Sequence, residues 1–297
     1  MKNVKNTIII LVAFFASLNT FAADYFLVAG SGWNKIAIIN KETLEPIWTY
    51  GLPKGGECNS VDYTKAGNIA FSYSKGAAVV AQSGAIIFNI DAGEGEQIQH
   101  ISEIKGGYLV GICGTPSRIL EVDKFGRTKK EITYDTGLKH AHNQHRQIKK
   151  TKKGHYLVPI VGKGIILELD SEGNIVREVT VGGVPYSISE LPNGNWLVPC
   201  GDKGYMVEIN PETSEVVMRI DNSTFNDEIK LGFVAETIRY KNGNTIFCNW
   251  LGHTKDKQQP ILIELNKDNQ IIWRVENNTP NLGAISAIDP LNGKFYK

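Results

Sequence analysis

Net charge, cysteine and long apolar runs are all scarce in this sequence. Its 297 residues include 32 Lys and Arg against 31 Asp and Glu, so the formal net charge is +1. A protein that binds nucleic acid needs a clear basic excess or patch, so we expect no nucleic-acid partner. Beyond the first residues, no apolar stretch is long enough to cross a bilayer as a helix, so we expect no membrane span.

The N-terminal segment has the layout of a secretory signal peptide. Lys2 and Lys5 give a positive start, the apolar run Ile8 to Ala16 follows, and small residues lead to Ala22. This order is typical of a leader that is removed after export. We therefore expect residues 1–22 to be cleaved, and the mature chain 23–297 to be a single domain in the periplasm or secreted. No cysteine stands at the cleavage point, which argues against a lipoprotein anchor.

A short phrase recurs along the mature chain: a glycine turn followed by an apolar strand. Its copies are Gly67-Asn68-Ile69, Gly107-Tyr108-Leu109, Gly154-His155-Tyr156, Gly194-Asn195-Trp196 and Gly243-Asn244-Thr245. Alternating apolar and β-branched residues mark each unit as about four short strands, and no segment shows a helical period. Four strands repeated at this spacing are the signature of a β-propeller.

The ends of the chain predict how the ring closes. The mature chain begins at the second strand of a unit, whereas an unclaimed inner strand, Ala284 to Leu291, stands near the C-terminus. That strand would complete the first blade and remove the open edges. The predicted fold is therefore all-β: a six-bladed propeller of four-stranded antiparallel blades, closed by the C-terminal strand. A seven-bladed ring is the alternative.

The four cysteines fall in different blades of this scheme. Cys113, Cys200 and Cys248 lie in second strands, and Cys58 lies where an inner strand begins. Neighbouring sheets pack about 10 Å apart, beyond disulfide reach between backbones. We therefore expect four free, buried thiols, although an exported protein permits disulfides.

Most of the candidate binding residues map to one face of the predicted propeller. Inner strands begin on this face, and the turns between second and third strands lie there too. Five of the six histidines map to it, with Arg146 and Glu236 expected to point into the channel. The candidate ligand-binding residues are His100, His140, His142, His145, Arg146, Tyr186, Glu236, Trp250 and His253.

The run from His140 to Arg146 leaves three interpretations open. It could form a polar plug or contact a neutral ligand, bind a metal through His140, His142 and His145, or provide a catalytic acid or base. The His-x-His spacing places two imidazoles on one side of an extended segment. The recurring Glu121, Glu168, Glu208 and Glu264 hold one repeat position, so we expect a structural role for them.

These phrases resemble those of exported proteins with quinoprotein-like (PQQ-binding-like) β-propeller repeats. The residues that carry the resemblance are Ile263-Glu264-Leu265-Asn266, Ile271-Ile272-Trp273 and Asn249-Trp250-Leu251-Gly252-His253. The resemblance implies the propeller fold and leaves the chemistry open. True quinoprotein dehydrogenases use more blades, a calcium site and two adjacent cysteines. This chain has no adjacent cysteines, so no PQQ is expected, while a metal remains an open alternative.

These observations favour an exported, monomeric propeller that binds a small polar ligand, such as a sugar or glycan fragment, at the channel mouth. Tyr186 and Trp250 would stack on the sugar, while Glu and His side chains would hydrogen-bond to it. Two other functions stay open: a lyase, hydrolase or transferase that uses a channel-mouth histidine, and a scaffold for another exported protein.

Overall fold

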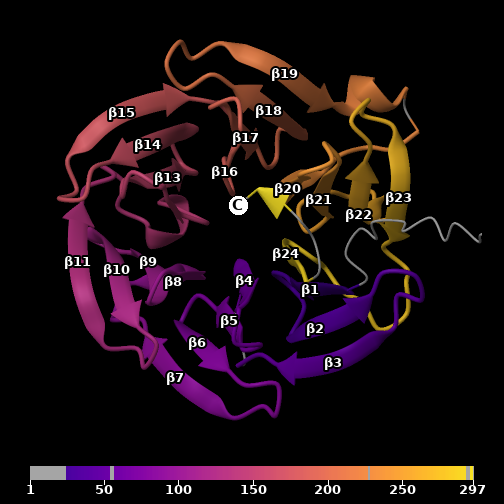
Figure 1. Cartoon of the computed structure of the whole chain (residues 1–297). Coiled ribbons are helices and arrows are strands. Elements are labelled where there is room, and N and C mark those ends of the chain that lie inside the picture. Colours follow the sequence, from indigo (N-terminus) through magenta and orange to yellow (C-terminus); the bar gives the residue numbers. More distant parts are fainter. Residues whose placement is uncertain (1–24, 54–56, 227, 292–294, 297) are drawn as a thin grey trace, which may run out of the picture.

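Six four-stranded units surround one central axis. The computed structural model describes residues 25–53, 57–226, 228–291 and 295–296, so the predicted signal peptide, residues 1–22, lies outside the described residues. All strand pairs are antiparallel, and the blades follow one another around a closed ring (Figure 1). The six-bladed prediction is confirmed, and the seven-bladed alternative is wrong.

In each of blades 2 to 6, the four main strands are continuous in sequence and run from the axis outward in chain order. Blade 2 consists of β4 (Ser60–Tyr63), β5 (Ile69–Ser72), β6 (Gly76–Val80) and β7 (Ile86–Asp91). Blade 3 consists of β8 (Gln97–Ile104), β9 (Gly107–Cys113), β10 (Ser117–Asp123) and β11 (Thr128–Tyr134). Blade 4 consists of β12 (Lys149–Lys150), β13 (Tyr156–Ile160), β14 (Ile165–Leu169) and β15 (Ile175–Thr180).

Blade 5 consists of β16 (Ser189–Glu190), β17 (Trp196–Pro199), β18 (Tyr205–Ile209) and β19 (Val216–Asp221). Blade 6 consists of β20 (Phe233–Tyr240), β21 (Thr245–Trp250), β22 (Pro260–Leu265) and β23 (Ile271–Glu276). A short fifth strand, β25 (Phe295–Tyr296), pairs with β20. The helical segments of the described residues are two 3-10 turns, η1 (Ala141–Asn143) and η2 (Asn222–Phe225), and none of their helices is long and apolar enough to cross a membrane.

Blade 1 joins the two ends of the chain. Its inner strand is β24 (Ala287–Pro290), and β1 (Tyr25–Ala29), β2 (Lys35–Asn40) and β3 (Pro46–Gly51) follow outward. Val28 is paired with Ile288, and the yellow β24 lies beside the indigo β1 in Figure 1. The predicted closure by the C-terminal strand is confirmed.

The burial pattern explains why these segments form blades. Every residue of β9 and β22 is buried, because the middle strands are covered on both faces by the neighbouring blades. The outer strand β3 instead alternates between half-buried and exposed residues along its whole length. Two apolar faces per sheet can be removed from water only by stacking sheets radially, so the repeat itself dictates the ring.

Two smaller predictions concern repeated positions in the blades. All four cysteines are free and buried, as expected. The recurring glutamates contact nearby blade residues: Glu121 pairs with Lys150 at 2.5 Å, Glu168 with His155 at 2.8 Å, and Glu208 accepts from Asn195 at 2.8 Å. Glu264 accepts from Asn244 at 3.2 Å and pairs with Lys41. These contacts agree with a structural role in each blade.

Candidate functional site

We call the end of the channel where the inner strands begin the mouth. His142 and Arg146 lie there and are bonded to each other. Nη2 of Arg146 lies 3.1 Å from Nε2 of His142. A guanidinium can only donate, so Nε2 accepts and the imidazole carries its proton on Nδ1. That Nδ1 lies 3.3 Å from Oε1 of Gln97 and 3.6 Å from a carboxylate oxygen of Glu57.

The surroundings of His142 keep its imidazole neutral. Burial lowers its pKa from the ordinary value, and the charge of Arg146 lowers it further; Glu57 opposes these effects, and His253 adds a smaller lowering. Because half of the side chain remains exposed, a solute can reach this ring from solvent. The mouth therefore presents a neutral histidine between a carboxylate and a guanidinium.

His145 lies inside the blades and not at the mouth surface. Its ring is fully buried, and Nδ1 lies 2.6 Å from the hydroxyl of Tyr134. Burial lowers the pKa of His145 to about 4, with a smaller contribution from Arg146 and an opposing one from the backbone of Gly111. A neutral histidine bonded to a core tyrosine is a packing residue. We had expected His145 at the mouth, and the structure places it in the interior instead.

The extended His-x-His arrangement, which had left a metal site open as one of three interpretations, is not present in the described residues. His140 and His142 lie around the 3-10 turn η1, not on an extended strand, so the two-residue spacing no longer places both rings on one side. Within the described ranges, no three His, Cys, Asp or Glu side chains are placed to hold a metal ion. His140 is exposed just before this turn, while His145 is buried beyond it.

Aromatic side chains occupy one side of the mouth. Trp250 is half-buried, its ring lies 4.7 Å from His253, and its Nε1 donates to the carbonyl of Ser31 at 2.8 Å. His253 is exposed and lies 2.8 Å from Asp202. Tyr186, which we expected beside Trp250 as an open wall for a sugar, is instead buried edge-on against Phe233.

Below the mouth, a layer of buried polar side chains closes the channel. We call this layer the floor; it consists of Asn59, Gln99, Gln147 and Tyr186. The hydroxyl of Tyr186 donates to Oδ1 of Asn59 at 2.9 Å, and Nε2 of Gln147 donates to the carbonyl of Asn59 at 2.9 Å. Gln99 accepts from Asn59. Asn59 and Tyr186 enter from opposite blades, 2 and 5, so their bond crosses the axis.

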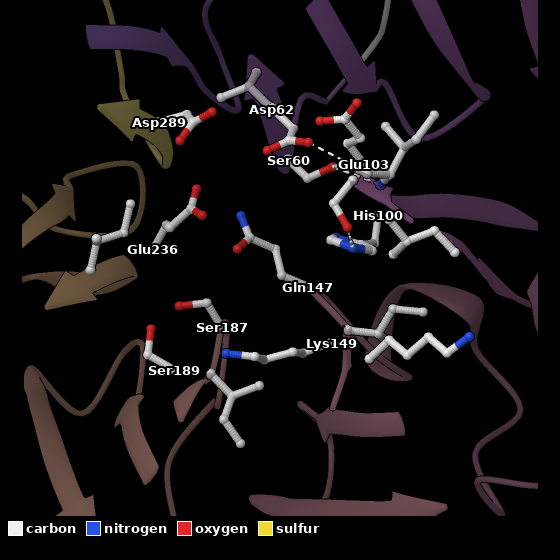
Figure 2. A pocket seen from close by; sticks show the side chains of 18 of the residues that line it. Ser60, Asp62, His100, Glu103, Gln147, Lys149, Ser187, Ser189, Glu236 and Asp289 are labelled. Carbon is white, nitrogen blue, oxygen red and sulfur yellow. Dashed lines mark hydrogen bonds between the residues drawn. The ribbon is translucent and has the colours of Figure 1, made fainter. Parts of the chain in front are cut away.

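Beyond the floor, the channel opens into a cavity of about 420 Å³. The cavity lies toward the face where the inner strands end. Figure 2 shows polar side chains from different blades pointing into this space, with Gln147 near its middle. The polar residues that line it are Ser60, Asp62, His100, Glu103, Gln147, Lys149, Ser187, Ser189, Glu236 and Asp289. Val61, Ile101, Ile148 and Ile188 supply apolar wall between them.

The cavity side chains also hold adjacent blades together. Inner strands of neighbouring blades share no backbone ladder, so their edge N–H groups need other acceptors. Each acceptor comes from the preceding blade: Asp62 accepts from the N–H of Glu103 at 2.6 Å, Asp289 from Tyr63 at 2.7 Å, Glu236 from Ile288 at 2.8 Å and Ser60 from Ile101 at 2.9 Å. These bonds fix the carboxylates in place around the cavity.

The candidate residues thus divide among three places. His140, His142, Arg146, Trp250 and His253 lie at or just beneath the mouth, whereas His145 and Tyr186 are buried. His100 and Glu236 line the cavity on the other side of the floor. Arg146 donates to the carbonyl of His142, whereas Glu236 accepts from the backbone N–H of Ile288.

Most cavity residues were missed from the sequence. The signal was present as an alternation of polar, β-branched and polar residues in the inner strands: Ser60-Val61-Asp62, Gln147-Ile148-Lys149 and Ser187-Ile188-Ser189. Strand alternation turns the two polar members of each triplet the same way.

Comparison with known proteins identifies the family. Residues 30–270 match the model of the Mal s 1 allergenic protein-like family. The chain belongs to this family. A crystal structure of a protein of unknown function from Bacteroides caccae is 40% identical, with a TM-score of 0.85, and the match covers 90% of this chain and 98% of that one. No curated protein matches the chain.

More distant structures share the propeller fold with this member of the Mal s 1-like family. A streptogramin B lyase is 15% identical with a TM-score of 0.59, and the match covers 88% of this chain and 85% of that one. The WD40 propeller domain of Doa1 is 16% identical with a TM-score of 0.56, covering 75% and 71%. The resemblance to quinoprotein-like repeat proteins is thus confirmed as far as the propeller, within a family of a different name.

Proposed function

We propose that this propeller is an exported binding protein whose cavity holds a small, hydroxyl-rich ligand, such as a monosaccharide or a short glycan fragment. The observation that carries the proposal is the cavity itself, where polar side chains from different blades converge on one space. The ligand is placed in this cavity, beneath the floor, because Tyr186 is covered and cannot form the stacking surface expected at the mouth.

The size and lining of the cavity suit such a ligand. About 420 Å³ falls within the range of roughly 300–1,000 Å³ that is usual for small-molecule pockets. Carboxylates such as Glu236 accept hydrogen bonds from hydroxyl groups, while Lys149 and the amide of Gln147 donate to ring and hydroxyl oxygens. Aliphatic residues such as Ile148 and Ile188 offer contact to the C–H faces of a ring.

The hydrogen-bond acceptors of the cavity are already held in fixed positions, which favours ligand binding. Glu236 and Asp62 each accept a backbone N–H from the next blade, so little side-chain freedom remains to be lost when a ligand arrives. Acceptors that are already ordered lower the entropic cost of association. The same bonds also serve the fold, so the test must separate binding from stability.

Calorimetric titration of the mature protein with glucose, galactose, N-acetylglucosamine and glucuronate tests the proposal. We expect saturable binding of at least one of these sugars, weakened about ten-fold or more by Glu236→Gln, because the amide replaces a charged acceptor. Glu228→Gln, at the exposed outer surface beside Arg274, is the control and should bind like the wild type. Equal affinities in the two variants, or no binding of any sugar in the panel, would contradict the proposal.

A further inference from the structure

Arg146 and Arg239 differ from the other arginines in how their charge is compensated, because neither makes an ion pair within the described residues. Arg118, Arg127, Arg177, Arg219 and Arg274 each pair with at least one carboxylate. Arg146 is only 7% exposed, yet the described part of the chain gives it no carboxylate partner within ion-pair distance. A buried charge is costly unless a counter-charge accompanies it. Of these two arginines, Arg146 is the one at the mouth, beside His142, whereas Arg239 lies near the far end of β20.

The donors of Arg146 are only partly used. Nη1 donates to the carbonyl oxygens of His142 at 2.7 Å and His145 at 3.1 Å, and Nη2 donates to Nε2 of His142. A guanidinium has five N–H groups, so Nε–H and the second N–H of Nη2 remain. The bonds that are made hold the group in a fixed orientation. Two adjacent donors on a planar fork match the two oxygens of a carboxylate.

We propose that the mouth binds the carboxylate of a small organic acid through Arg146. The carboxylate supplies the missing counter-charge and accepts the remaining donors of the guanidinium. The half-buried ring of Trp250, beside His253, offers apolar contact for the carbon skeleton of the acid.

The negative charge already present at the mouth does not occupy this place. Glu57 accepts from the hydroxyl of Ser31 at 2.7 Å and lies 3.6 Å from Nδ1 of His142, whereas Arg146 lies at Nε2. The imidazole therefore separates Glu57 from Arg146. The second acidic side chain of this region, Asp202, lies 2.8 Å from Nδ1 of His253. This site is distinct from the cavity, because the floor lies between them.

An acid bound at Arg146 should leave a measurable sign on His142. Neutralising the guanidinium removes a charge that disfavours the imidazolium, so the pKa of His142 should rise on binding. Glu57, Gln97 and His253 face the same ring, but binding at Arg146 leaves their contacts in place. The change therefore reports on Arg146 and not on general screening, provided that ionic strength is held constant.

The experiment titrates the mature protein with succinate at fixed ionic strength and follows binding by calorimetry. We expect saturable binding to the wild type and about ten-fold or weaker binding to Arg146→Gln, as expected for loss of a charge-assisted pair. Arg118→Gln is the matched control, because that arginine already pairs with Glu96. It should bind succinate like the wild type.

A second measurement keeps the test decisive if Arg146→Gln does not fold. Proton NMR of His142 in the wild type, with and without saturating succinate, should show a higher pKa in the complex. An unchanged pKa overturns the proposal, and so does equal binding by Arg146→Gln, absence of saturable succinate binding, or binding of sulfate without succinate. Glu236→Gln should not alter succinate binding, so failure here is distinguishable from failure of the sugar-binding proposal.

Discussion

The hydroxyl of Tyr186 donates a hydrogen bond of 2.9 Å to Oδ1 of Asn59, and this bond joins two opposite blades across the axis. Tyr186→Phe removes the donor while keeping the ring. We expect a loss of about 1–3 kcal/mol in the free energy of unfolding, because a buried acceptor is left without its partner. Chemical denaturation measures the loss. Tyr50→Phe, on the half-buried outer strand β3, should change stability much less, and equal losses would contradict the prediction.

Removal of the closing strand should open the ring. A chain that ends at Gly283 lacks β24, so blade 1 loses its inner strand and the edge of β1 loses its partner. We expect aggregation or loss of cooperative unfolding, seen by calorimetry and light scattering. A chain that ends at Leu291 keeps β24 and is the control, which should unfold cooperatively. A chain shortened to Gly283 that melts like the full chain would show that closure is unimportant.

His145 should make the protein less stable in mild acid. Its pKa is lowered by burial to about 4, below the ordinary 6.5, so the unfolded state takes up the proton more readily. Stability is therefore full above about pH 6.5 and is lost as pH falls toward 4, by about 3 kcal/mol from this group.

Melting temperatures between pH 4 and 7.5 test this dependence on His145. His145→Gln should flatten the slope relative to the wild type. His155→Gln is the control, because His155 is only partly buried and lies 2.8 Å from Glu168. The prediction fails if His145→Gln and His155→Gln have the same slope.

The cysteines should be inert in the folded protein. Burial raises the pKa of the Cys113 and Cys200 thiols to about 12 each, and it also raises the pKa of Cys58 and Cys248. Because the thiolate is the reactive form, we expect almost no reaction with a thiol reagent at neutral pH. In denaturant without reductant, four thiols should react. Fewer than four would indicate a disulfide, against the free state seen here.

The architecture could be predicted because each blade repeats the same short sequence pattern of a turn followed by a strand. Phrases such as Gly154-His155-Tyr156 mark the turn and second strand, and the unpaired strand near Ile288 identified the closure. Repetition averages out local ambiguity, since the same alternation must be satisfied in every copy.

The site was less predictable. Assigning a residue to one face of the propeller does not say how far along the channel axis its side chain lies. His100 was placed with the other histidines at the entrance of an inner strand, but β8 is long and carries it past the floor into the cavity. His145 was assigned to the mouth as part of a polar run, yet its local backbone turns the ring toward Tyr134. Side-chain depth depends on packing between blades, and the repeat does not encode it.

The pairing of β1 with β24 also governs the order in which the protein can fold. Val28 and Ile288 lie near opposite ends of the described chain, yet they are neighbours in one sheet. The four main strands of each of blades 2 to 6 are contiguous in sequence, so they can form as soon as their own segment is available. The first blade cannot form until β24 has been synthesised, because loop closure over this separation must come first. A nascent chain therefore keeps the edge of β1 exposed longest, and that edge is the part most in need of protection during biogenesis.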